Sequence, residues 1–270
     1  MMETLVLMVG VVFVAFVFAP VGLGGGMLFV PLLHYIGNWP IDGTLLAVSL
    51  VLTWAVSIGS GLKHQKEGFV HAAAANSARY GAVMGALIGV GIVVALGDRL
   101  DGVFKMLSIV MLVWALNRTW KKRKRGGPLE EHDGKVGDIR HLQLRVGSSI
   151  GGALSAVLGI GAGVIYVPVL QQQAGLGPRT AIASSLSIMM VVVPVAIATL
   201  LLTAPEGLVE ELRTQPWWLY LLPLLAVGGA TAGAKFGIER ISKENIMNIF
   251  MALVAIVLIR YVLDVATLIT

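Results

Sequence analysis

The stretch "GLGGGMLFVP" occupies residues 22–31 and returns as "GIGAGVIYVP" at residues 159–168. Each copy places glycines at alternate positions and a proline nine residues after the first glycine, inside an otherwise apolar run. The repeated positions are Gly22, Gly24, Gly26 and Pro31 in the first copy, and Gly159, Gly161, Gly163 and Pro168 in the second. Because glycine and proline both interrupt regular helix, the pattern predicts a helix that is broken twice in the same way.

The composition is that of an integral membrane protein. Hydrophobic residues make up 57% of the 270-residue chain and charged residues 13%, with a mean hydropathy of +0.85. Apolar runs cover residues 3–35, 44–62, 70–97, 102–117, 146–170, 181–204, 217–238 and 246–269. Most are near or above the ~20 residues that cross a bilayer as helix. We expect one polytopic all-α membrane domain in the plasma or inner membrane, with its first span kept because no signal-peptide pattern precedes it.

Several other protein classes are disfavoured by the residues present. The chain has no cysteine, and its five histidines lack the spacing of metal ligands, so we expect no metal, no cofactor and no enzymatic activity. "GSSIG" at residues 147–151 matches a hydrolase nucleophile pattern but begins an apolar helix instead of following a strand. The basic run "KKRKR" at residues 121–125 is interpreted as a contact with anionic lipid and not with nucleic acid.

The two halves repeat further features in the same order. The glycine motif is followed by "LLAVSLV" around Ser49 in the first half and by "IASSLSI" around Ser185 in the second. Glycines at four-residue spacing then pair Gly81, Gly85 and Gly89 with Gly229, Gly233 and Gly237. Such spacing indicates helix faces on which neighbouring backbones approach closely. We therefore divide the chain into a first membrane repeat (1–120), a cytoplasmic basic linker (121–141) and a second membrane repeat (142–270).

The length of the first apolar run suggests how the repeats are oriented. Residues 4–36 would form a helix of ~50 Å, which is too long for one crossing and too short for two. A re-entrant helical hairpin that turns at the glycines fits this length. If each repeat is such a hairpin plus three transmembrane helices, the second repeat is inverted. The inverted arrangement also places most of the 20 Lys and Arg residues on the cytoplasmic side.

The breaks themselves point to a transport function. Backbone groups freed by a break are costly in hydrocarbon, so they must face protein or a polar cavity. Broken helices from inverted halves commonly form the substrate site of secondary transporters near the bilayer midplane. The second leg of each hairpin would direct its N-terminal amides at this cavity, which favours an anion. Helix packing alone stays open as another explanation of the glycines.

The paired motifs also carry a family resemblance. "GLGGGMLFVPLL", "GIGAGVIYVPVL" and the loop "KHQKEGFVHAAAA" resemble the TauE/SafE sulfite exporter family of transmembrane permeases over nearly the whole chain. The resemblance implies transport, mostly outward, of sulfur-containing anions such as sulfite, sulfoacetate or other organosulfonates. An anion channel, or a permease for another small anion, remains the alternative. The second copy departs from the first where Ala162 replaces the glycine at Gly25.

The candidate substrate site combines backbone amides with hydroxyl groups. The expected substrate-binding residues are Gly24, Gly25, Gly26, Ser49, Gly161, Ala162, Gly163, Ser184 and Ser185. A second group of candidates comprises His34, Thr53, Arg79 and Ser187, of which His34 is expected at a solvated interface and Arg79 to extend to the membrane surface. Gly22, Pro31, Gly159 and Pro168 are expected to shape the breaks. Every Asp and Glu falls in a predicted loop or helix end, so we expect no buried carboxylate relay.

Overall fold

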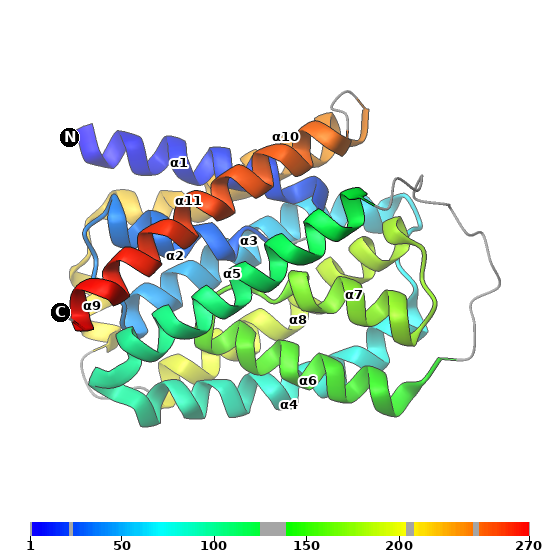
Figure 1. The fold of residues 1–270 in the computed structure, drawn as a ribbon, viewed down its shortest axis with the longest axis horizontal. Helices are drawn as coiled ribbons and strands as arrows, with labels where there is room; N and C mark the ends of the chain where they lie inside the picture. The colour runs from blue at the N-terminus through cyan, green and yellow to red at the C-terminus, as the bar shows by residue number, and fades with distance from the viewer. Residues whose placement is uncertain (1, 22–23, 125–138, 204–207, 240–242, 270) are drawn as a thin grey trace.

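A computed structural model describes the chain except residues 1, 22–23, 125–138, 204–207, 240–242 and 270 (Figure 1). The described first half contains α1 (Met2–Phe18), α2 (Gly26–Tyr35), α3 (Gly43–Lys66), α4 (Ala72–Leu96) and α5 (Leu100–Lys124). The described second half contains α6 (His141–Leu158), α7 (Gly163–Gln173), α8 (Pro178–Thr203), α9 (Leu208–Thr214), α10 (Leu222–Glu239) and α11 (Lys243–Ile269). The predicted all-helical architecture is confirmed.

Four segments of the described chain are long and apolar enough to cross a membrane. These segments are Gly43–Lys66, Ala72–Lys121, Pro178–Thr203 and Trp217–Phe236. The second of them joins α4 to α5 through a short 3-10 turn at Gly97–Arg99. The sequence predicted spans in each of these regions, and the structure confirms a multi-pass helical protein.

Helix ends follow from local sequence. Asp42 precedes α3 and its carboxylate accepts a hydrogen bond from the Leu45 N–H at 2.9 Å, which satisfies one of the free amides of the first turn. His71 does the same for α4 through the Ala74 N–H. Helix α6 ends at Leu158 and is followed by Gly159, which adopts a left-handed conformation (φ 61°) that glycine accepts without steric cost.

Both glycine motifs interrupt a helix in the structure. Helix α1 ends at Phe18 and α2 begins at Gly26, while α6 ends at Leu158 and α7 begins at Gly163; Gly22 lies outside the described residues. In the first half a Cβ at Gly10 would touch Leu32, and in the second half a Cβ at Gly147 would touch Val169. Leu32 and Val169 each directly follow the proline of their motif. The helices on either side of each break therefore contact each other at equivalent positions.

The glycine faces pack each half against the other. Helix α4 lies along α6, with Gly81, Gly85 and Gly89 directly against the backbone of Arg145, Ser149 and Ala153. Helix α10 lies along α1, with Gly229 and Gly233 against the backbone of Val12 and Phe16. The predicted close approach of backbones is confirmed at these positions.

The register of the two glycine faces needs one correction. Ser149 and Val12 stand at the same distance before the first glycine of their respective motifs. Gly85, which contacts Ser149, is therefore equivalent to Gly229, which contacts Val12. Pairing Gly81 with Gly229 by spacing alone was wrong by one helical turn. Two series of glycines at four-residue spacing align equally well when one series is moved by four residues.

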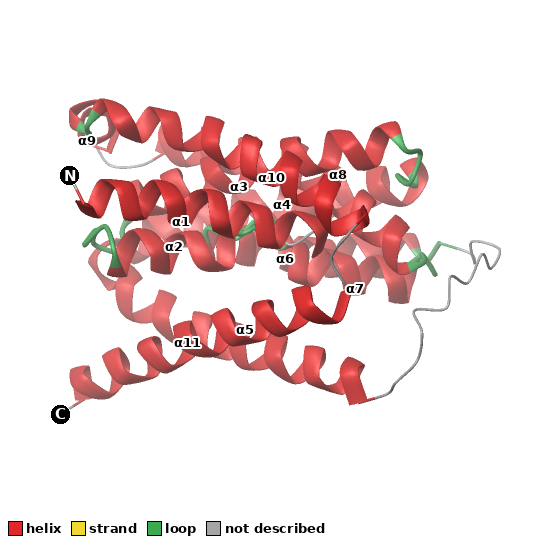
Figure 2. Ribbon diagram, turned by 90° about the horizontal axis from the view of Figure 1, so that it is seen from above, coloured by secondary structure: helices red, strands yellow, loops and turns green. Residues whose placement is uncertain are grey.

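Helices α5 and α11 form a separate layer. They lie side by side in front of the other helices in Figure 1, and the view from above in Figure 2 shows them apart from the main body. Of the helices that flank the breaks, α1 and α2 contact α11, and α6 contacts α5. The space between the pair and the breaks is where the cavity described below is found.

Candidate functional site

The two breaks meet in the interior of the molecule. Gly26, the first residue of α2, lies so close to Ile160 that a Cβ at this position would collide with the Ile160 backbone. Ile160 belongs to the short segment between α6 and α7. Segments that are far apart in sequence thus touch backbone to backbone, which a side chain at residue 26 would prevent.

Thr53 and Met189 lie against both breaks at once. A Cβ at Gly24 would stand 3.0 Å from Thr53 Cγ2 and 3.2 Å from Met189 Sδ, and a Cβ at Gly161 would meet the same two side chains. The Thr53 hydroxyl is buried and has no hydrogen-bond partner among the described residues. The sequence placed Thr53 in the second group of candidates, and it missed Met189 because a methionine in an apolar helix carries no distinguishing signal.

The second leg of each break begins without a side-chain cap. Gly25 precedes α2 with φ 75°, and Ala162 precedes α7 with φ 53°; neither makes a side-chain hydrogen bond to the helix start. Both are buried, as are Pro31 within α2 and Pro168 within α7. Uncapped helix N-termini carry free amides and a partial positive charge, which suits an oxyanion. Ala162 adopts this left-handed conformation at a steric cost that Gly25 avoids.

The predicted serines occupy three different environments. Ser49 donates a hydrogen bond of 2.8 Å to the carbonyl oxygen of Gly159, so a first-half hydroxyl holds the second break. Ser184 accepts from the His71 N–H at 3.0 Å, at the start of α4. Ser185 is fully buried, and its hydroxyl has no partner within the described part of the chain. Of the three, the structure brings Ser49 directly to a break.

Arg79 is held by α8. Its guanidinium donates to the Ser187 hydroxyl at 2.6 Å and to the Ser187 carbonyl at 3.1 Å, and also to the Asn76 side chain at 2.7 Å. No carboxylate among the described residues forms an ion pair with it. Its expected extension to the membrane surface stays a prediction. These hydrogen bonds join Arg79 on α4 to Ser187 on α8. Ser187 lies two residues before Met189.

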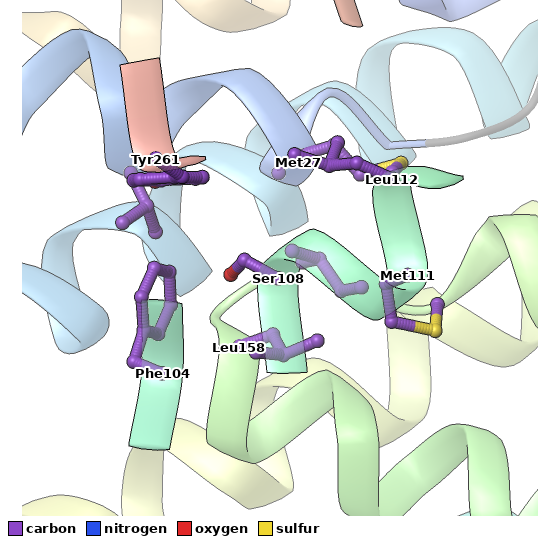
Figure 3. Close-up of a pocket in the computed structure, with 10 residues that line it drawn as sticks. Met27, Phe104, Ser108, Met111, Leu112, Leu158 and Tyr261 are labelled. Atoms are coloured by element: carbon purple, nitrogen blue, oxygen red, sulfur yellow. The ribbon is translucent and has the colours of Figure 1, made fainter. Parts of the chain in front are cut away.

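A narrow cavity separates the breaks from the α5 and α11 pair (Figure 3). Gly26, Met27, Val30, Leu158 and Ile160 line it from the side of the breaks. Phe104, Ser108, Met111, Leu112 and Tyr261 line it from α5 and α11. The cavity has room for about one water molecule, so an oxyanion requires it to widen.

The fold brings one carboxylate into a network that the sequence did not predict. Asp264, near the end of α11, accepts a hydrogen bond of 2.8 Å from the Tyr35 hydroxyl. Its Oδ2 atom also lies 3.7 Å from Nζ of the buried Lys105 and 4.0 Å from Nε2 of His34. The Asp264 side chain is 30% exposed, and its partners meet because the fold brings α2, α5 and α11 together at this end. His34 also contacts the Trp39 carbonyl through Nδ1, at 2.7 Å.

The described residues contain no group of three or more His, Asp and Glu side chains that could hold a metal ion. Apolar spans, interrupted half-helices that meet inside the protein and a buried cavity beside them define the class of integral membrane transport proteins. Within that class, the model of the family Sulfite exporter TauE/SafE matches residues 7–261, and the chain belongs to this family. Members of the family are membrane transporters and not enzymes, and membership implies export of sulfite or sulfonate-type anions. No curated protein and no solved structure matches the chain.

Proposed function

We propose that the protein is a secondary transporter that exports a small sulfur-containing oxyanion, such as sulfite, sulfoacetate or another organosulfonate, through a site where the two breaks meet. The observation that carries this proposal is the backbone contact between Gly26 and Ile160, beside two helix starts without side-chain caps. Family membership supplies the substrate class. The site supplies the chemistry that such a substrate needs.

Neutral hydrogen-bond donors suit a transported anion, which must be released from its site as well as bound. Amide and hydroxyl groups distribute hydrogen bonds over the oxygens of a sulfite or sulfonate without the tight binding of an opposite charge. We assign this role to the backbone at Gly24–Gly26 and Gly161–Gly163 and to the Thr53 hydroxyl, which has no hydrogen-bond partner among the described residues. Ser49 positions the second break through Gly159, and Ser184 and Ser185 extend the line of hydroxyls along α8.

Arg79 and Ser187 contribute a charge to the same site. The guanidinium lacks a carboxylate partner in the described chain and is bound to neutral oxygens of Ser187 and Asn76. A positive charge held in this way attracts anions from a distance. We place it on the route to the breaks, with Ser187 as its anchor on α8.

We also propose that the halves are inverted repeats, each a re-entrant hairpin followed by three transmembrane helices, with residues 121–141 as a cytoplasmic linker. The equivalent contacts Gly10–Leu32 and Gly147–Val169 support a hairpin in both halves. The reciprocal packing of α4 on α6 and α10 on α1 supports a two-fold relation between residues 1–120 and 142–270. The charge distribution supports the inversion.

The membrane potential is sufficient to drive export of an anion. An inside-negative potential favours exit by about 2.3 kcal/mol per charge for each 100 mV. The alternative is an anion channel. A transporter that alternates access saturates with substrate, whereas a channel conducts in proportion to concentration.

The first test replaces Gly25 or Gly161 by valine. Both residues have positive φ, so a β-branched residue is strained there and places bulk against the breaks. We expect efflux of radiolabelled sulfite or sulfoacetate from vesicles to fall at least tenfold while the protein still inserts. Gly91→Ala serves as the control, since no atom lies within 4 Å of a Cβ at Gly91. Normal transport by both valine variants would exclude the breaks as the substrate site.

A further inference from the structure

A charged network lies where α2, α5 and α11 come together. Lys105 on α5 is 7% exposed, and its Nζ atom lies 2.9 Å from Asp101 Oδ2 and 3.7 Å from Asp264 Oδ2. Tyr35 donates to the same oxygen of Asp264 at 2.8 Å. His34 also approaches Asp264 at 4.0 Å, and the Arg260 guanidinium lies 4.9 Å from the centre of the Tyr35 ring. The groups come from α2, α5 and α11.

The network adjoins the cavity that both breaks line. Phe104 and Tyr261, the sequence neighbours of Lys105 and Arg260, line the cavity and contact each other edge to face at 6.0 Å (Figure 3). Successive residues of a helix turn by about 100°, so Lys105 projects within about 20° of Leu112, another lining residue. Tyr261 is 1% exposed, and its hydroxyl has no partner among the residues described. Tyr261 therefore lines the cavity and carries a buried hydroxyl that has no partner among the described residues.

The two contacts of Lys105 are unequal. Asp101 is four residues away on the same helix and at hydrogen-bond distance, whereas Asp264 is on another helix and beyond that distance. The Asp264 side chain is 30% exposed and has Tyr35 as a second partner, while the Lys105 side chain is 9% exposed. Asp264 can therefore separate from Lys105 into water. The Lys105 ammonium group is buried away from water, and a buried charge needs an opposite charge nearby.

We propose that Lys105 is a second binding point for the transported anion, and that Asp264 is the carboxylate with which the anion competes. This inference rests on the proposed function and adds a residue to it. In the structure Lys105 and Asp264 stay 3.7 Å apart, next in sequence or structure to residues that line the cavity. When an oxyanion leaves the breaks and passes Tyr261 and Ser108, it takes the place of Asp264 beside Lys105. In the proposed inverted topology this end is the outer one, so the exported anion meets Lys105 on its way out.

The test compares Asp264→Asn with Lys105→Gln in the purified full-length protein, with sulfite as the probe. Asp264→Asn removes the competitor and keeps the shape, so we expect sulfite to bind three- to tenfold more tightly. Lys105→Gln removes the cation, so binding should weaken at least tenfold. Lys105→Arg keeps the charge and should retain most of the affinity. A salt bridge with a purely structural role predicts weaker or unchanged binding in both neutral variants, never changes in opposite directions.

Calorimetry gives the affinity, and a melting curve for each variant shows whether it is folded. If Lys105→Gln does not fold, Asp264→Asn and Lys105→Arg decide: failure of Asp264→Asn to tighten binding overturns the inference. Loss of affinity in Lys105→Arg together with unchanged affinity in Asp264→Asn also overturns it. Failure of the proposed function is recognised separately, because the unmodified protein would then bind no sulfite. The Gly161→Val variant, tested in parallel, reports on the breaks alone.

Discussion

Glycine serves two different purposes in the breaks and on the helix faces. At the breaks, Gly24, Gly25 and Gly161 have positive φ, and the surrounding space is occupied by Thr53 and Met189 among others. On the faces, Gly85 and Gly233 keep helical geometry, and their missing side chains let a neighbouring backbone approach. Replacement is therefore expected to damage conformation and binding in one region, and the distance between helices in the other.

The largest effect on stability is expected from Gly85→Ala. A methyl group at Gly85 would overlap the Ser149 carbonyl oxygen, so α4 and α6 must separate. Overpacking of this kind typically lowers the free energy of unfolding by about 1–3 kcal/mol, and we expect the upper part of that range because the obstacle is backbone. Thermal unfolding in detergent measures the loss, while the affinity for sulfite should stay within about twofold.

Gly91→Ala provides the matched control on the same helix. No atom lies within 4 Å of a Cβ at Gly91, so this change should stabilise α4 by about 0.5–1 kcal/mol through helix propensity alone. Equal destabilisation by both alanine variants would show that the contact with Ser149 is not the cause. A large fall in sulfite affinity in Gly85→Ala would contradict the idea that glycines on the helix faces affect stability and glycines at the breaks affect binding.

A smaller effect, on affinity, is expected from Thr53→Val. The substitution keeps the shape that contacts Gly24 and Gly161 but removes a buried hydroxyl that has no partner in the described chain. Stability should hold or rise slightly, since an unsatisfied polar group is lost. If the hydroxyl binds the anion, a hydrogen bond to a charged group worth about 1.5–3 kcal/mol disappears, and affinity falls about tenfold or more. Unchanged affinity would make Thr53 a packing residue.

The smallest change, and a favourable one, is expected from Ala162→Gly. Ala162 has φ 53°, where an L-residue with a Cβ is strained by about 1–2 kcal/mol and glycine is not. Because glycine also makes the unfolded chain more flexible, we expect a net stabilisation of about 0.5–1 kcal/mol. Transport should persist, since the first break already has glycine at this position. A lower melting temperature would show that the Ala162 methyl packs more favourably than its backbone strain costs.

The breaks could be predicted because their signal is local. Glycine at alternate positions, followed by proline in an apolar run, predicts an interrupted helix whatever the tertiary arrangement around it. The contact of Gly26 with Ile160 is not local, although the repetition of the motif made a meeting of the two breaks a natural expectation. The exact register of the glycine faces escaped prediction, because a four-residue period is unchanged by a shift of one turn.

The charged network could not be predicted by the same reasoning. Tyr35 and Asp264 are separated by almost the whole chain, and neither shows any pattern that relates it to Lys105. Asp264 stands near a helix end in the sequence, where a charged residue is ordinarily exposed to water. Its partners become visible when α2, α5 and α11 are brought together. Ion pairs between distant helices are a property of the tertiary arrangement, whereas breaks and packing faces can be recognised within a single segment.

The crossed packing of the halves, α4 on α6 and α10 on α1, has a consequence for the origin of the gene. Each half carries both a glycine face and the backbone surface that such a face needs, but it uses the surface of the other half. If the halves are the inverted repeats proposed above, a half-length ancestor would have formed both interfaces between the two subunits of a homodimer. Fusion would then have preserved the contacts and fixed the stoichiometry. The later divergence of Ala162 from Gly25 would have become possible once the two copies were no longer encoded by one sequence.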